Sequence, residues 1–159
     1  KQNLKKKLIE SLNDSFLLFF LNKKRDASTI LNSQKKLNSK NIKSLNKIGK
    51  LVYDAERILK NKKKLPSKIA QMGDLLSTNW YWKKKNNKQV SYKEIDNLYK
   101  LGMKSGAYGG KLLGAGGGGY FLFLSSKKNQ KKIKFKLNKY STVKVEIYQK
   151  GTEIIYENK

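Results

Sequence analysis

The sequence predicts an α+β domain in which helices pack on one face of a small antiparallel sheet. Segments whose apolar residues have helical spacing fill most of the N-terminal two thirds, whereas strand-like segments gather near the C-terminus. Apolar side chains make up 38% and aromatic side chains 11% of the 159 residues, which is enough to form a hydrophobic core. Because no internal repeat or linker is evident, we expect residues 1–159 to form one domain.

The N-terminal part is predicted to contain helices and one early strand. Residues 1–12 favour a helix, and residues 15–21 form a continuous apolar run whose length is typical of a buried strand. Apolar residues with helical spacing then predict amphipathic helices over 26–37 and 42–59. The expected buried face of the second of these consists of Ile42, Leu45, Ile48, Val52, Ala55 and Leu59.

Two more helices are predicted in the middle of the chain. Pro66 favours a helix start, because proline is well suited to the first helical position. The expected buried face of this helix consists of Ile69, Met72, Leu75, Leu76 and Trp80. Ser91 and Glu94 have the spacing of a capping box, which predicts the start of the next helix. Its expected buried face consists of Ile95, Leu98, Tyr99 and Gly102.

The C-terminal part is predicted to supply most of the sheet. Residues 120–124 form an apolar strand, and residues 142–148 and 152–156 suggest a hairpin around a turn at 149–151. Residues 133–137 leave two interpretations open. Their alternation favours a strand, whereas the four-residue spacing of two apolar positions also fits a helix.

The composition excludes several chemistries. The chain contains neither Cys nor His, so by itself it cannot provide a zinc finger, a disulfide framework, a Ser-His-Asp system or a histidine base. Its 11 carboxylates show no paired spacing, so we assign none of them a catalytic or metal-binding role. The longest apolar run, residues 16–21, is far shorter than the ~20 residues of a membrane span, and no signal-like N-terminus is seen. We therefore expect a cytoplasmic protein.

The formal net charge of +26 raises the possibility of nucleic-acid binding. Only Arg25 and Arg57 are arginines among 37 cations, although recognition of bases and phosphates favours the planar arginine side chain. The charge is also spread evenly, since residues 1–80 and residues 81–159 each carry a net charge of +13. We expect no specific nucleic-acid partner, and keep a basic nucleic-acid-binding module as an alternative function.

The most unusual feature is a glycine-rich segment, because 9 of the 12 glycines lie between Gly102 and Gly119. Each ordered glycine costs roughly 0.5–1 kcal/mol relative to alanine, so such a run needs a compensating role. One role is close approach of the backbone to a bound anion such as a phosphate. The alternative is a tight turn or bulge that leads into the strand at Tyr120.

Two common nucleotide motifs do not fit this segment. Its letters satisfy G-x-G-x-x-G, but a dinucleotide loop follows a strand and opens a helix, whereas this segment is expected to follow a helix and open a strand. A P-loop would end in Gly-Lys-Ser or Gly-Lys-Thr, which is missing here.

The segment Gly106–Leu122 instead resembles the third conserved motif of the GHMP small-molecule kinases. Within that family it is most similar to the kinases that act on D-glycero-D-manno-heptose 7-phosphate. Three further segments resemble the same subfamily, so that the resemblance spans most of residues 16–124: the strand 16–21 followed by Arg25–Ser28, the W-x-x-K stretch Trp80–Lys83, and the helix segment Ile95–Tyr99. One departure is Leu21-Asn22, which stands where these kinases usually have Thr-Gly.

The resemblance implies a ferredoxin-like C-terminal GHMP kinase domain, with helices on a four-stranded antiparallel sheet and a helix near residues 127–138. It implies an ATP-dependent kinase that transfers the γ-phosphate of ATP to a hydroxyl of a sugar or sugar phosphate, with heptose 7-phosphate as the expected acceptor. ATP and Mg²⁺ would be bound mainly by an N-terminal half whose motifs residues 1–159 do not contain. A non-catalytic relic of such a kinase is the remaining alternative.

The expected site contains phosphate-binding residues and no catalytic residue. We expect the backbone amides of the segment from Gly114 to Gly119 to border the phosphate and sugar-phosphate site; its members are Gly114, Ala115, Gly116, Gly117, Gly118 and Gly119. Lys111 is the nearest candidate cation, unless it is simply a solvated lysine. Arg25 is expected to face the phosphate of the acceptor, with a surface ion pair as the alternative.

Overall fold

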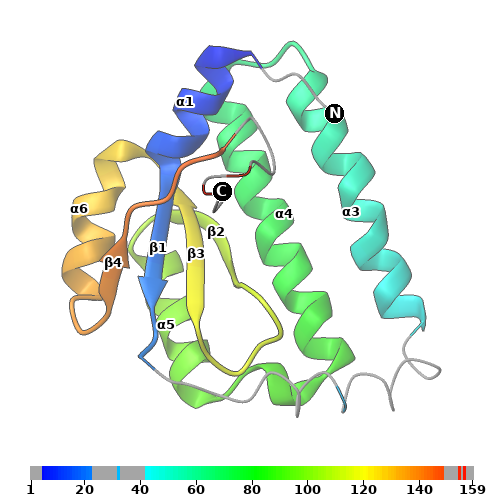
Figure 1. Ribbon diagram of the computed structural model, residues 1–159, viewed down its shortest axis with the longest axis vertical. Helices are drawn as coiled ribbons and strands as arrows, with labels where there is room; N and C mark the ends of the chain where they lie inside the picture. The colour runs from blue at the N-terminus through cyan, green and yellow to red at the C-terminus, as the bar shows by residue number, and fades with distance from the viewer. Residues whose placement is uncertain (1–4, 23–31, 33–41, 149–153, 155, 157–159) are drawn as a thin grey trace.

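Four strands form one antiparallel sheet in the order β2-β3-β1-β4 in the computed structural model, which describes residues 5–22, 32, 42–148, 154 and 156. The helices and strands follow one another along the chain as α1 (Lys6–Ser15), β1 (Phe16–Phe20), α3 (Ile42–Lys60), α4 (Leu65–Asn86), the 3₁₀ turn η1 (Lys88–Val90), α5 (Lys93–Lys104), β2 (Ala107–Leu112), β3 (Tyr120–Ser125), α6 (Lys127–Lys136) and β4 (Ser141–Val143). The predicted α+β class, with helices and a small antiparallel sheet, is confirmed (Figure 1).

The central strand β1 is paired with β3 over the whole length of β1, from Phe16 opposite Leu124 to Phe20 opposite Tyr120. Side chains alternate across a strand, so every second residue of each points to the same face. The main core lies on the face that α4, α5 and α6 cover, and it contains Leu17, Phe19, Trp80, Ile95, Leu98, Leu112, Phe121, Phe123, Ile133 and Leu137. Four rings of this core meet across the two strands and α4, with Phe19 edge-on to Phe123 and Trp80 edge-on to Phe121.

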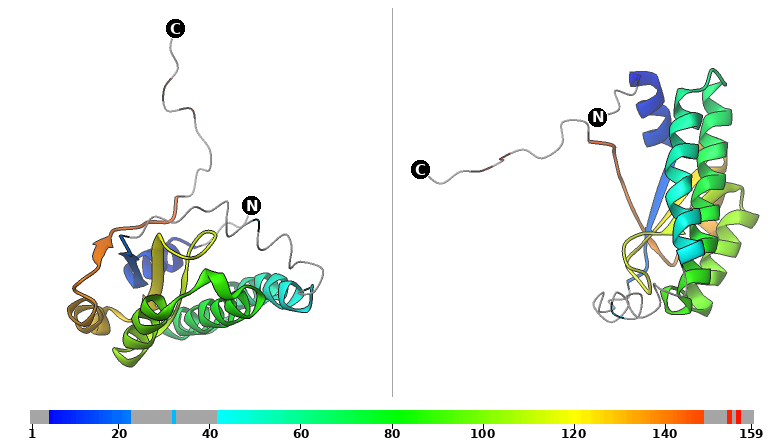
Figure 2. Two further views of the ribbon diagram at one scale, coloured as in Figure 1. Left: turned by 90° about the horizontal axis from the view of Figure 1, so that it is seen from below. Right: turned by 90° about the vertical axis from the view of Figure 1, so that its right-hand side faces the viewer.

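Helix α4 runs alongside β2, and α3 lies on the side of α4 that faces away from the sheet (Figures 1 and 2). Two glycines allow α4 to approach β2 this closely. A Cβ atom on Gly109 would lie 1.9 Å from the carbonyl oxygen of Gly73, and a Cβ atom on Gly73 would lie 2.6 Å from the Cβ atom of Tyr108. No side chain larger than hydrogen fits at either position unless the backbone moves.

Helix α3 joins α4 through a buried lysine. The Nζ atom of Lys68, a residue only 8% exposed, donates a hydrogen bond of 2.8 Å to the carbonyl oxygen of Leu59 in the last turn of α3. The helix over 42–59 is confirmed, but its expected buried face is wrong in part, because Ile42, Leu45 and Val52 are exposed. Of the described elements, α3 has its extensive contacts with α4 alone, so much of its circumference is left uncovered.

Helix α4 contains the whole predicted segment from Pro66 to Trp80, so this helix is confirmed, but the buried part of its face is narrower than expected. Ile69 and Trp80 are buried, whereas Met72, Leu75 and Leu76 are only partly buried. Helix α4 contacts β2 through Gly73 and the adjacent turns of the helix. A broad apolar stripe does not make this contact.

The predicted capping box is wrong. Helix α5 begins at Lys93 with Tyr92 as its N-cap, without a side-chain cap. The hydroxyl of Ser91 donates instead to a carboxylate oxygen of Asp96. The buried face of α5 is confirmed at Ile95, Leu98 and Gly102.

The C-terminal part differs from the expectation in two respects. Residues 127–136 are a helix, as the family resemblance implied, so the alternating pattern near residue 135 does not mark a strand. The strand expected over 142–148 is limited to β4, which pairs with β1. In the second arm of the expected hairpin, the described Ile154 and Tyr156 belong to no strand. The helix expected over 26–37 lies, apart from Asn32, outside the described residues.

Within the part of the chain that the structure describes, no helix combines the length and the apolar character that crossing a membrane requires.

The glycine contact between α4 and β2 predicts a large difference between two alanine substitutions. Gly73→Ala places a methyl group against Tyr108 and should lower the free energy of unfolding by about 1–3 kcal/mol, as overpacking generally does. Gly49→Ala, in helix α3, meets nothing within 4 Å and should leave the stability unchanged or raise it by up to about 1 kcal/mol. Urea denaturation of both variants measures the difference, and equal stabilities would contradict the close contact.

Candidate functional site

The glycine-rich segment forms the loop of a β-hairpin. It connects β2 to β3, and the N–H of Leu113 donates 2.9 Å to the carbonyl oxygen of Tyr120 where the loop closes. The expectation that the loop follows a helix directly is therefore wrong, because strand β2 lies between α5 and the loop. The strand was missed because Gly109 and Gly110 disfavour a strand, and they are present for the close packing against α4 and β3.

One side of the loop is fixed to the rest of the domain. The N–H of Gly117 donates 2.8 Å to the carbonyl oxygen of Val90, the last residue of η1. A Cβ atom on Gly116 would lie 2.6 Å from the Cβ atom of Val90, so glycine is required there by contact as well as by its φ of +121°. The middle of the loop therefore fits the alternative interpretation, in which the glycines form a tight turn.

The other side of the loop is open. Gly114 and Gly119 have φ values of +67° and +89°, which favour glycine, yet a Cβ atom at either position would meet nothing within 4 Å. Packing therefore explains why position 116 is a glycine. It does not explain the glycines at the two ends of the loop, which border open space. A backbone that is held on one side and open on the other can approach a ligand closely.

The end of β1 lies beside the last glycine of the loop. The N–H of Leu21 donates 2.9 Å to the carbonyl oxygen of Gly119. Asn22, which follows, has a φ of +46°. Asparagine is one of the few residues other than glycine that adopt this left-handed conformation at low cost, so Asn22 suits the backbone at a position where glycine was expected from the family resemblance.

Two lysines lie near the start of the loop, one bonded to its first glycine and one on the strand that precedes it. Lys83, in the last turn of α4, donates a hydrogen bond from Nζ to the carbonyl oxygen of Gly114, and Lys111 extends from β2. Both are partly buried. Burial, together with the smaller effect of the nearby charge of Lys111, lowers the pKa of Lys83 to about 8. Burial also lowers the pKa of Lys111. Lys111 is thus not a freely solvated lysine.

The strand that carries Lys111 is anchored to two helices. The N–H of Gly110 donates 3.2 Å to the hydroxyl of Ser77 on α4, and the hydroxyl of Tyr99 on α5 donates 3.0 Å to the same oxygen. Strand β2 lies at the edge of the sheet, so this bond satisfies a backbone donor outside the strand pairing. It also fixes the backbone one residue before Lys111.

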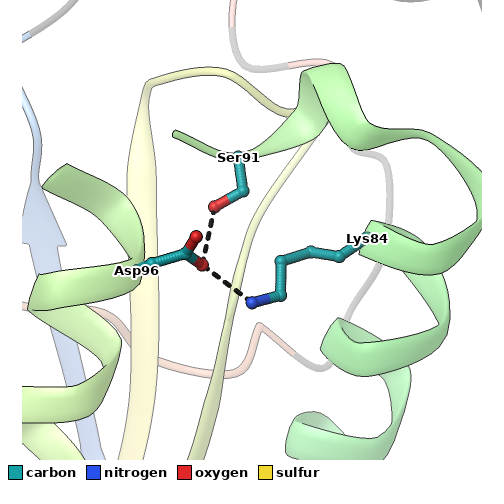
Figure 3. A network of polar contacts seen from close by, with 3 residues as sticks. All are labelled: Lys84, Ser91 and Asp96. Carbon is teal, nitrogen blue, oxygen red and sulfur yellow. Dashed lines mark hydrogen bonds and ion pairs between the residues drawn. The ribbon is translucent and has the colours of Figure 1, made fainter. Parts of the chain in front are cut away.

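A polar network holds the segment on which the loop rests (Figure 3). Asp96 on α5 accepts hydrogen bonds from the Ser91 hydroxyl at 3.0 Å and from the Lys84 ammonium at 2.7 Å. The Lys84 ammonium also lies over the Trp80 ring, 5.4 Å from its centroid. Because Ser91 directly follows Val90, these contacts tie the support of the loop to both α4 and α5.

The structure thus brings together Lys111 and the glycine-rich residues 114–119 of the expected site, and adds Lys83. The sequence signal for Lys83 was the W-x-x-K stretch, whose first residue, Trp80, is a core residue. Arg25, the other expected phosphate ligand, lies outside the described residues. A hollow lined by Asp14, Lys127 and Thr142 lies by β1 and β4, away from the loop.

The described residues suit a phosphate better than a magnesium ion. Mg²⁺ prefers oxygen ligands, chiefly carboxylates. Within residues 5–22, 32, 42–148, 154 and 156, no group of three or more His, Cys, Asp or Glu side chains could hold a metal ion. Two ammonium groups beside an open glycine loop, in contrast, are ordinary partners of a phosphate.

The lowered pKa of Lys83 predicts a pH-dependent stability difference between the wild-type chain and a Lys83→Met variant. In the unfolded chain this lysine keeps its ordinary pKa of 10.5, whereas in the folded chain its pKa is about 8. Between these values the unfolded state binds more protons, so the stability of the wild type should rise with pH relative to the variant. Urea denaturation of both proteins at about pH 7, 9 and 10 measures this difference; a pH-independent difference would contradict the burial of an ammonium group at this position.

Comparison with known proteins gives the family. Residues 67–142 match the family model described as GHMP kinases C terminal. A D-glycero-alpha-D-manno-heptose 7-phosphate kinase of Campylobacter jejuni is 33% identical over 122 residues, which cover 76% of this chain and 34% of that protein. The chain therefore spans about a third of the length of this curated relative.

Solved structures have the same fold. The mevalonate kinase of Methanococcus jannaschii superposes with a TM-score of 0.68 at 28% identity, covering 89% of this chain and 42% of that one. A D-glycero-D-manno-heptose 1-phosphate kinase of Bacteroides thetaiotaomicron superposes with a TM-score of 0.57 at 17% identity, covering 91% and 36% of the two chains. At 17% identity, the similarity to the heptose 1-phosphate kinase shows only that the fold is shared. The family model, the related sequence and the fold agree, and residues 67–142 of this chain belong to a GHMP kinase C-terminal domain.

Proposed function

We propose that this chain is the C-terminal part of an ATP-dependent sugar kinase that transfers the γ-phosphate of ATP to a hydroxyl of a sugar or sugar phosphate. The observation that carries the proposal is the open glycine loop with Lys83 and Lys111 at one end, in a chain of the GHMP kinase family. Phosphoryl transfer depends mainly on positioning and on stabilisation of negative charge. Backbone amides and ammonium groups supply both.

Within this proposal the loop residues 114–119 border the transferred phosphate and the acceptor. The fixed side of the loop, at Gly116 and Gly117, keeps its backbone in place, and the open ends at Gly114 and Gly119 face the reactants. Lys111 contributes positive charge, and Arg25 faces the phosphate of the acceptor. The hydrogen bond between Lys83 and the Gly114 carbonyl orients the first residue of the loop.

A phosphorylated heptose is the acceptor that we favour. The curated relative with 33% identity is a heptose 7-phosphate kinase. Mevalonate kinases have the same fold, so the fold itself does not select a sugar. The acceptor must therefore be identified by activity measurements with a heptose 7-phosphate, the unphosphorylated heptose and mevalonate side by side.

ATP and magnesium would be bound mainly outside this chain. The described carboxylates do not gather at the glycine loop, so we propose that an N-terminal half of the kinase holds the metal and most of the nucleotide. The chain alone is then expected to lack kinase activity. A coupled ADP-release assay on the isolated 159-residue chain with ATP and heptose 7-phosphate tests this expectation, and turnover comparable to that of intact kinases would overturn it.

The role of the loop predicts loss of activity from a single methyl group. In the intact protein, Gly116→Ala places a Cβ atom against Val90 and should shift the loop, lowering kcat/KM for the acceptor by at least about tenfold, since small misplacements at a reacting centre are costly.

Gly49→Ala, a methyl group added far from the loop on α3, is the matched control and should keep full activity. Circular dichroism and thermal unfolding of both variants separate loss of activity from loss of folding. Full activity in a folded Gly116→Ala protein would contradict the proposed role of the loop.

A further inference from the structure

Lys83 and Lys111 are two neighbouring cations that the rest of the described structure leaves without a counter-charge. In the part of the chain that the structure describes, neither forms an ion pair with a carboxylate. The next residue along α4, Lys84, does have such a partner, Asp96. Asp96 also accepts a hydrogen bond from Ser91, so its carboxylate is already engaged away from the two lysines.

Leaving two ammonium groups together is unfavourable for the free protein. Both side chains are partly buried, where like charges repel more strongly than in bulk water. Most other lysines of this strongly basic chain are on exposed surfaces, where such repulsion is screened. A bound anion of two negative charges would remove the repulsion, so the arrangement favours a phosphate over a carboxylate.

The geometry is suited to one phosphate group. An ammonium group has three donors. Lys83 uses one of them on the Gly114 carbonyl, which fixes its position at the open end of the loop and leaves two donors for a ligand. Lys111 approaches from β2, whose backbone is held one residue earlier by Ser77. Both cations are thus presented from anchored elements, α4 and β2, which pack closely on each other.

We propose that Lys83 and Lys111 together bind one phosphate group of a reactant, beside Gly114 at the open end of the glycine loop. This inference rests on the proposed function for the identity of the reactants. The group is either the phosphate already carried by the acceptor or the terminal phosphate of ATP, which share the same charge and hydrogen-bond acceptors. Lys83 is a phosphate ligand in either case, and not merely a support of the loop.

Binding of inorganic phosphate to the intact protein that carries this chain tests the lysine pair directly. Isothermal titration should show the dissociation constant for phosphate rising at least tenfold in Lys83→Gln and in Lys111→Gln. Lys83→Arg, which keeps the charge, should bind more tightly than Lys83→Gln. The matched control is Lys100→Gln, an exposed lysine on α5, which should bind phosphate within twofold of the wild type. Equal binding by Lys83→Gln and Lys100→Gln would overturn the proposal.

Steady-state kinetics then identify the source of the phosphate. If the pair binds the acceptor, Lys83→Gln should raise KM for the heptose phosphate at least tenfold, while KM for the unphosphorylated heptose and for ATP stay within twofold. If the pair binds ATP, KM for ATP should rise instead. A lower kcat with every KM and the phosphate affinity unchanged would mean that Lys83 only supports the loop, which contradicts the proposal.

The two proposals fail in different ways. If the protein phosphorylates no sugar but Lys83→Gln loses phosphate binding, the proposed function is refuted and the proposal for the lysine pair stands. If the protein phosphorylates a sugar and Lys83→Gln has the phosphate affinity and KM values of the wild type, the proposed function stands and the proposal for the lysine pair is refuted.

Discussion

The close contact between α4 and β2 is the constraint on which the rest of the site depends. Because Gly73 and Gly109 lack side chains, the helix lies directly against the edge strand. This brings Lys83, in the last turn of the helix, to the loop that follows the strand, and aligns Ser77 with the Gly110 amide. A helix held farther away by ordinary side chains would leave Lys83 and Lys111 on separate surfaces. The same packing that stabilises the fold therefore assembles the charges.

The glycine loop combines two requirements that are usually met by separate segments. Its middle is determined by packing against Val90, whereas its ends have left-handed backbone angles beside open space. The Lys84–Asp96–Ser91 network makes this division possible, since it holds the supporting segment between α4 and α5. The loop backbone is thus held at Gly117 by Val90 and at the carbonyls of its end residues by Lys83 and Leu21, while the space beside Gly114 and Gly119 is left for a ligand.

Much of the fold could be predicted from the sequence, because apolar periodicity reports burial. The apolar pattern correctly predicted β1, α3, α4, α5 and β3. It failed where a cause other than burial determined the residues. Strand β2 was missed because its glycines are selected by the approach of α4, against strand propensity. For α6 the alternation was misleading, since Phe135 is 72% exposed and reports no buried face. The glycine loop and Lys111 were found from the motif, whereas the contact of Lys83 joins positions 31 residues apart and required the packed structure.

The most direct test of this account is a crystal structure of the intact protein with ADP and a heptose 7-phosphate bound. The account requires a phosphate group within hydrogen-bonding distance of the Lys83 and Lys111 ammonium groups, beside Gly114, with the backbone of residues 114–119 lining the acceptor. A structure in which both reactants bind with full occupancy and every phosphate lies away from this loop and these two lysines would contradict it.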